Sequence, residues 1–107
     1  MKPRALNPIE VVGQLSRLEG WRLQGDGAEV GIAKTFSFAS YSEVMSFVNA
    51  VAFMAQGMNH HPELVVHPST CVVFWRTHDV QGLSQLDFEA AQRVETWLKG
   101  AQATLAA

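Results

Sequence analysis

Asn59-His60-His61-Pro62-Glu63 marks the point where the chain changes from a helical to a strand-like pattern. The apolar residues before it recur three or four apart, as on one face of a helix: Val44, Phe47, Val48, Val51, Ala52, Ala55 and Met58. This helix must end near Asn59, because Pro62 disfavours helical geometry at His61. The stretch therefore predicts the end of a long helix and a reversal into a short strand over 63–66.

Three helix starts carry one signal, a polar residue that can cap the helix and an acid three residues later. The pairs are Asn7 with Glu10, Ser40 with Glu43, and Ser84 with Asp87. They predict helices over 8–18, from Ser40 to about Asn59, and over 85–99. The first helix should turn its apolar residues inward: Val11, Val12, Leu15 and Leu18. The Ala-rich end, 100–107, either continues the last helix or frays.

The segments between these helices read as strands. Residues 21–23 and 28–38 flank a Gly-Asp-Gly turn, and 70–77 is rich in β-branched and aromatic residues. The element order is then α-β-β-α-β-β-α, and short connections favour an antiparallel sheet. We predict an α+β fold in which three helices pack on one face of a four-stranded antiparallel sheet, as a single domain over 1–107.

The amino-acid composition argues against several classes of protein. The 107 residues are 48% hydrophobic and 17% charged, with a formal net charge of -2, which favours a globular core over disorder. No Lys/Arg run supports direct nucleic-acid binding, and no apolar run predicts a membrane span or a signal peptide. The single cysteine, Cys71, suits a core position and a reducing compartment, so we expect a cytoplasmic protein.

Three of the four histidines fall in two places. His60 and His61 follow the long helix, and His78 follows the strand 70–77. Imidazole transfers protons near neutral pH. A helix C-terminus favours a protonated imidazole, whereas a second imidazole nearby opposes a second charge. The pattern predicts a proton-transfer site with one histidine as acid and another as base.

Simpler roles compete with this interpretation. His60 or His61 can cap the last carbonyls of the helix, and histidines also bind zinc, although adjacent histidines are poorly spaced chelators on a regular element. Asp79 is either a turn residue or, if the strand has already turned, the group that orients His78. Asp87 is explained by its helix cap alone.

The motifs together resemble the pterin-4a-carbinolamine dehydratase family over about residues 18–98. The resemblance is carried by Asn59-His60-His61-Pro62-Glu63, Thr77-His78-Asp79, Gly82-Leu83-Ser84 with Asp87, Gly20-Trp21 and Phe36-Ser37-Phe38. It implies the same helix-backed sheet, and association into homodimers or homotetramers through sheet edges and helices. It also implies dehydration of 4a-hydroxytetrahydropterin to quinonoid dihydropterin without metal or cofactor, which recycles pterin for aromatic amino-acid hydroxylases.

The resemblance also assigns roles by position. It makes His60, His61 and His78 the acid/base set, and it makes Asp87, Asp79, Pro62 and Trp21 substrate-binding or supporting residues. Trp21 can stack on the flat pterin or belong to the core, and both readings stay open.

The chain departs from the family pattern at three positions. Gln56 stands where the family usually has an acid, Leu64 where it has tryptophan, and Pro68 where it has another aromatic. These departures support a second hypothesis, an inactive binding module with a protein partner, as implied by the coactivator and Rubisco-assembly roles known in the family. A zinc site at the histidines is a third.

Overall fold

The computed structural model describes residues 3–106, and the side chains of residues 3–102. Within them the order predicted from the sequence is confirmed. The α-helices and strands are α1 (Pro8–Leu15), β1 (Arg22–Gln24), β2 (Gly31–Ser37), α2 (Tyr41–Met58), β3 (Glu63–Val66), β4 (Thr70–Trp75) and α3 (Gln85–Ala106). Two short 3₁₀ turns, η1 (Gly27–Glu29) and η2 (His78–Val80), complete the fold.

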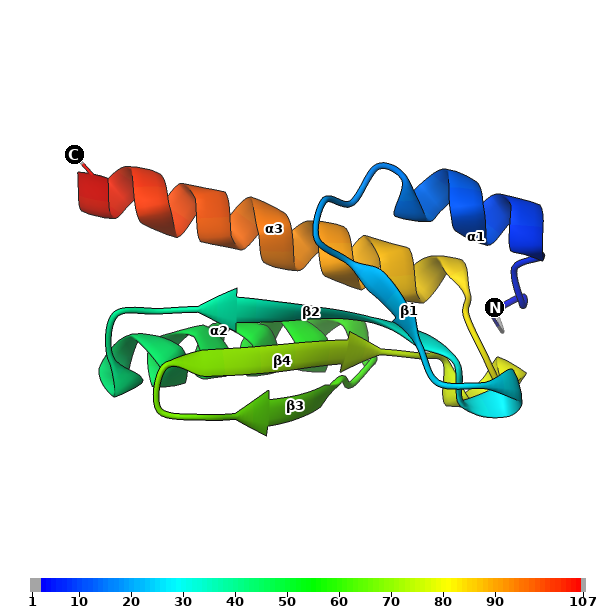
Figure 1. The fold of residues 1–107 in the computed structure, drawn as a ribbon, viewed down its shortest axis with the longest axis horizontal. Helices are drawn as coiled ribbons and strands as arrows, with labels where there is room; N and C mark the ends of the chain where they lie inside the picture. Colours follow the sequence, from blue (N-terminus) through cyan, green and yellow to red (C-terminus); the bar gives the residue numbers. More distant parts are fainter. Residues whose placement is uncertain (1–2, 107) are drawn as a thin grey trace.

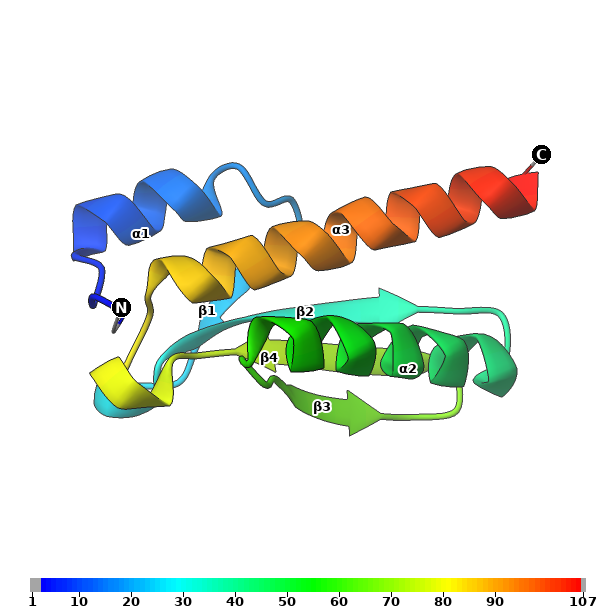
Figure 2. The same ribbon diagram turned by 180° about the vertical axis from the view of Figure 1, so that it is seen from behind.

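The sheet is antiparallel throughout, with the strand order β1-β2-β4-β3. Helices α2 and α3 lie along it, and α1 packs beside the first half of α3 (Figures 1 and 2). The predicted α+β architecture is therefore confirmed. The register pairs Ile32 with Trp75 and Phe36 with Cys71, which aligns the apolar residues of the two central strands toward the helices.

The core forms between this sheet face and the helices. Its fully buried side chains include Trp75 and Val73 from β4, Val44 and Phe47 from α2, and Val94 from α3. Cys71 is also buried, and burial raises the pKa of its thiol. The prediction that Cys71 belongs to the core is confirmed.

Several predicted boundaries and orientations are wrong. Helix α1 ends at Leu15 and not at Leu18, because Arg17 and Leu18 donate to carbonyls only three residues back, which tightens the chain out of the α-helix. Val12 was expected to point inward, yet it is 65% exposed. Ala52, expected on the apolar face of α2, is exposed as well.

Two strands are shorter than predicted. β2 begins at Gly31 because Glu29 donates to Asp26 and folds the preceding residues into η1. β4 ends at Trp75, since Thr77 pairs with Gly82 in an isolated bridge. Helix α3, by contrast, continues through the Ala-rich segment to Ala106. Across the described residues, every helix is too short or too polar to span a bilayer.

Candidate active site

The end of α2 aims His60 into the molecule. Asn59 adopts a left-handed conformation (φ 50°, ψ 42°), which asparagine tolerates better than most residues. The backbone N–H of Asn59 then donates to Gln56 O, and that of His60 donates to Ala55 O at 3.1 Å. This paired bonding satisfies the last helix carbonyls and reverses the chain. The predicted helix end at Asn59 is thereby explained.

The ring of His60 is held from two sides. It stacks on Trp75 of β4 with ring centroids 5.5 Å apart and an interplanar angle of 16°. Its Nε2 lies 2.7 Å from Asp87 Oδ1 in α3, and His60 is only 8% exposed. An ionised carboxylate only accepts hydrogen bonds, so this partner places the hydrogen of the neutral ring on Nε2 and leaves Nδ1 as the acceptor.

Asp87 is the centre of a buried polar network. It is 0% exposed, and its Oδ2 accepts the Thr77 hydroxyl at 2.8 Å and the Ser84 backbone N–H at 2.9 Å. The Thr77 hydroxyl also lies 2.6 Å from Ser84 Oγ. The Thr77 hydroxyl has one hydrogen, which it donates to Asp87. The hydroxyl of Ser84 must therefore be the donor in its contact with Thr77. All three residues are buried, so the network fixes His60 through fully desolvated hydrogen bonds.

The same carboxylate serves the helix and the histidine. Its bond to the Ser84 N–H is the reciprocal half of a capping box at the start of α3, and Ser84 Oγ accepts the Leu86 N–H at 3.2 Å. Its other oxygen bonds His60. Residue spacing explained Asp87 by the cap alone and the family resemblance made it a supporting residue, and the structure gives it contacts to both the helix start and His60.

The three motif histidines line one cleft. It has a volume of about 800 Å³, within the ~300–1,000 Å³ range of small-molecule sites. Its lining is Pro3, Met58, Asn59, His60, His61, Arg76, Thr77, His78, Asp79 and Leu86. His61 and His78 are exposed and come from different elements, the end of α2 and the start of η2. Asp79 is exposed on the same wall, where η2 has already turned the chain.

Two predicted site residues lie elsewhere. Trp21 is buried in the core, where its ring meets Phe36 edge-on at 5.9 Å, and it does not line the cleft. Pro62 is half-buried and is likewise absent from the lining. Sequence reasoning missed Arg76, which lines the cleft, and the support that Thr77 gives to Asp87. Thr77 could have been found, because it belongs to the Thr-His-Asp motif.

The three residues that depart from the family pattern do not line the histidine cleft. Gln56 is exposed on α2, Pro68 is exposed in the turn between β3 and β4, and Leu64 packs against the core. Among the described residues, no group of three or more His, Cys, Asp and Glu side chains is arranged to hold a metal ion. The described residues therefore offer no cluster of ligands for the hypothesised zinc site.

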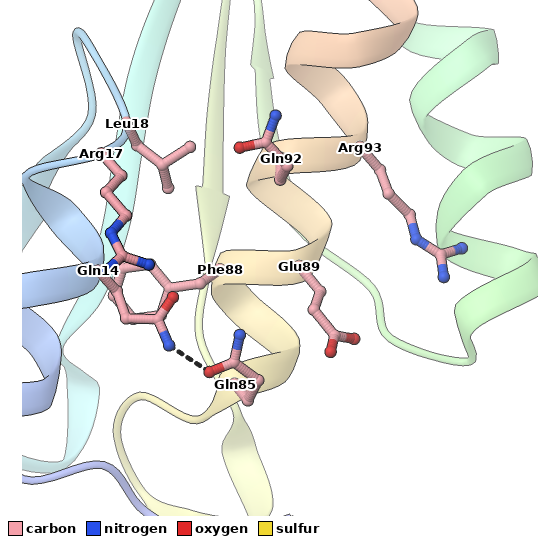
Figure 3. Close-up of a pocket in the computed structure, with 8 residues that line it drawn as sticks. All are labelled: Gln14, Arg17, Leu18, Gln85, Phe88, Glu89, Gln92 and Arg93. Atoms are coloured by element: carbon pink, nitrogen blue, oxygen red, sulfur yellow. Dashed lines mark hydrogen bonds between the residues drawn. The ribbon is translucent and has the colours of Figure 1, made fainter.

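A second hollow, of about 440 Å³, lies between α1 and α3. Figure 3 shows the amide of Gln14 reaching across to Gln85, with Arg17 on the α1 side and Glu89 and Arg93 along α3. Histidine is missing from its lining, whereas three histidines line the first cleft.

The chain is thus a small α+β protein in which three imidazoles line one cleft. The sequence model described as "Pterin 4 alpha carbinolamine dehydratase" matches residues 4–97. The chain therefore belongs to the pterin 4 alpha carbinolamine dehydratase family.

Two similar relatives carry the name "Putative pterin-4-alpha-carbinolamine dehydratase". The one from Paracidovorax citrulli is 52% identical over 99 residues, which cover 92% of this chain and 85% of the relative. The one from Sinorhizobium medicae is 38% identical over 100 residues, which cover 94% and 93%.

Two solved structures are also similar. A "transcriptional coactivator/pterin dehydratase" from Brucella melitensis has a TM-score of 0.79 at 29% identity, covering 87% of this chain and 97% of that one. A pterin dehydratase-like protein described as a RuBisCO assembly factor in the alpha-carboxysome has a TM-score of 0.62 at 22% identity, covering 73% and 88%. The second likeness shows the fold alone.

Proposed function

We propose that the protein dehydrates 4a-hydroxytetrahydropterin to quinonoid dihydropterin at the histidine cleft, recycling pterin for aromatic amino-acid hydroxylases. The observation that carries the proposal is the meeting of three imidazoles from two distant segments on one cleft of about 800 Å³. Family membership supports the substrate class.

The reaction needs one proton delivered and one removed. The C–O bond at carbon 4a breaks, and the leaving hydroxyl takes a proton to depart as water. The neighbouring ring nitrogen loses its proton, and the electron pair of that N–H bond forms the C=N double bond of the quinonoid product. No electrons are gained or lost overall, so the step requires no redox cofactor. Two positioned imidazoles, one protonated and one neutral, suit this exchange and typically contribute about 10²–10⁴-fold in rate.

The exposed pair, His61 and His78, are the residues we assign to contact with the substrate. Both side chains are open to the cleft and to water, so each can regain or release its proton between turnovers. His60 is nearly enclosed, and its Nε2–H is committed to Asp87. We therefore assign to His60 a ring held in a fixed orientation by its Nε2–H bond to Asp87, and to Asp87 the role of holding it there.

The test is the stopped-flow decay of the 4a-hydroxypterin absorbance. We expect wild-type protein to accelerate the decay over buffer, and His61→Ala and His78→Ala each to lose about 10²-fold or more of that acceleration. His67→Ala is the matched control, because His67 is exposed in the turn before β4 and does not line the cleft. It should keep the wild-type rate. A wild-type rate equal to that of buffer would end the enzymatic proposal.

A second candidate function is a binding module that acts through a protein partner. It is favoured by exposed apolar side chains: Phe53 on α2 is 83% exposed, and Val65 on β3 is 50% exposed. β3 is also an edge strand of the sheet, with backbone groups free to pair. The description of the Brucella melitensis structure as a coactivator points the same way.

Analytical ultracentrifugation with a candidate partner protein tests the second candidate; homo-oligomers alone do not separate the two, because the resemblance implies homodimers or homotetramers for the dehydratase as well. A binding module that uses either of these apolar side chains predicts a stoichiometric complex with a partner protein, which Phe53→Lys or Val65→Lys dissociates and His61→Ala leaves intact. A monomer with full dehydratase turnover contradicts it.

A further inference from the structure

Arg76 is a charged side chain on the cleft that the proposed dehydration leaves without a role. It stands one residue beyond β4, directly before Thr77, and lines the cleft with His61 and His78. Its Nη2 lies 3.1 Å from Glu29 Oε2. Glu29 belongs to η1, which connects β1 to β2 and lies at the same end of the molecule as η2 (Figure 1).

The contact between Arg76 and Glu29 is a loose one. The side chain of Arg76 is 21% exposed and that of Glu29 is 71% exposed, so water and salt screen their attraction. A guanidinium has five N–H donors in a planar fork that matches a carboxylate or phosphate. Arg76 can therefore exchange Glu29 for an anionic group on a ligand at small cost.

We propose that Arg76 makes the cleft selective for pterins whose side chain carries an anionic group such as a carboxylate. This inference rests on the proposed function and names its substrate class. The bicyclic ring is neutral, and the histidines act on the carbon and nitrogen where water is lost. The substituent outside the ring is then the partner that a cation at the cleft wall would recognise. Asp79 on the same wall opposes an anion, whereas whichever of His61 and His78 carries the catalytic proton favours it.

A purely structural role for Arg76 makes different predictions. In that role the ion pair only ties η1 to the end of β4, and breaking it from either side would weaken ligand binding equally or leave it unchanged. In the selective role Glu29 competes with the ligand. Removing Arg76 then weakens binding of an anionic pterin, and removing the charge of Glu29 strengthens it.

The experiment titrates the intrinsic fluorescence of two matched probes, 6-carboxypterin and 6-methylpterin, with the protein. We expect wild type to bind 6-carboxypterin about tenfold more tightly, the size of one charge-assisted contact, and Arg76→Gln to abolish this preference. Arg93→Gln is the control, because it removes the same charge from an exposed position on α3 outside the cleft. It should keep the preference.

The second arm of the experiment substitutes Glu29, the acid that pairs with Arg76. Glu29→Gln should tighten binding of 6-carboxypterin by about threefold, in line with the small worth of an exposed ion pair, and leave 6-methylpterin unchanged. Glu19→Gln, an exposed acid outside the cleft, controls for net charge. Equal binding of the two probes by wild type, a preference that survives Arg76→Gln, or Glu29→Gln binding no tighter than wild type would each overturn the inference. Wild-type dehydration of the 6-methyl substrate, measured beside these titrations, shows whether the proposed function survives such a result.

Discussion

Replacing Asp87 by asparagine tests the buried network most sharply. The carboxylate accepts three hydrogen bonds, from His60, Thr77 and the Ser84 backbone, at 2.7–2.9 Å. The amide of the Asp87→Asn variant would keep one oxygen, which can still accept from Thr77 and Ser84, but it would turn an NH₂ group toward His60. Two donors would then face each other unless His60 moves its hydrogen from Nε2 to Nδ1.

The expected loss of stability follows from replacing three hydrogen bonds to a charged carboxylate by bonds to a neutral amide. A hydrogen bond to a charged group is worth ~1.5–3 kcal/mol and a neutral one ~0.5–1.5 kcal/mol, so each of three bonds loses about 1 kcal/mol. Because Asp87 is fully buried, no solvent screening reduces this figure. We expect Asp87→Asn to lower the free energy of unfolding by about 3 kcal/mol, a large part of the ~5–15 kcal/mol typical of a domain.

Two assays check this prediction. Urea unfolding followed by tryptophan fluorescence gives the free energy, with Asp79→Asn as the exposed control that should stay within about 0.5 kcal/mol of wild type. Imidazole ¹⁵N shifts give the tautomer of His60, which should carry its hydrogen on Nε2 in wild type and on Nδ1 in Asp87→Asn. A loss of less than about 0.5 kcal/mol with an unchanged tautomer would refute the reasoning.

Three further predictions concern stability and reactivity. Hydrogen bonds from the Arg4 guanidinium and the Asn7 backbone lower the pKa of Glu10 to about 2. The stabilisation of α1 by this carboxylate should be complete above its ordinary pKa of 4.5 and lost as the pH falls toward 2, which an NMR titration of Glu10 measures. Cys71 should react with a thiol reagent in urea but not in the native state, because it is buried and its pKa is raised; rapid native labelling would contradict its core position. Gly31→Ala should cost about 1–3 kcal/mol in urea unfolding, since a Cβ there would meet the Phe74 ring at 2.6 Å and backbone that cannot move aside; an unchanged midpoint would show that the strand yields.

The sequence predicted the elements better than their ends. Caps and periodicity located α2 and the start of α3, because both signals are local. The end of α1 and the start of β2 depend on tight turns at Leu18 and Glu29, whose bonds reach only three residues back. The inward face of α1 was misjudged at Val12 because the short helix covers only part of the core.

The candidate site was predictable only in part. The motif pointed to three histidines, and all three line one cleft. Their unequal burial was beyond the sequence, because it depends on a contact between His60 and Asp87, 27 residues apart. No sequence pattern pointed to Arg76 as a cleft residue, because its position on the cleft depends on where β4 ends.

The central claim is that pterin binds at the histidine cleft, and amide chemical shifts on adding 6-methylpterin test it most directly. The account predicts that the shifts concentrate at Asn59, His61, His78 and Asp79, around the end of α2 and η2. Shifts concentrated instead on the hollow between α1 and α3 in Figure 3, at Gln14 and Gln92, with the histidine residues unmoved, would contradict it.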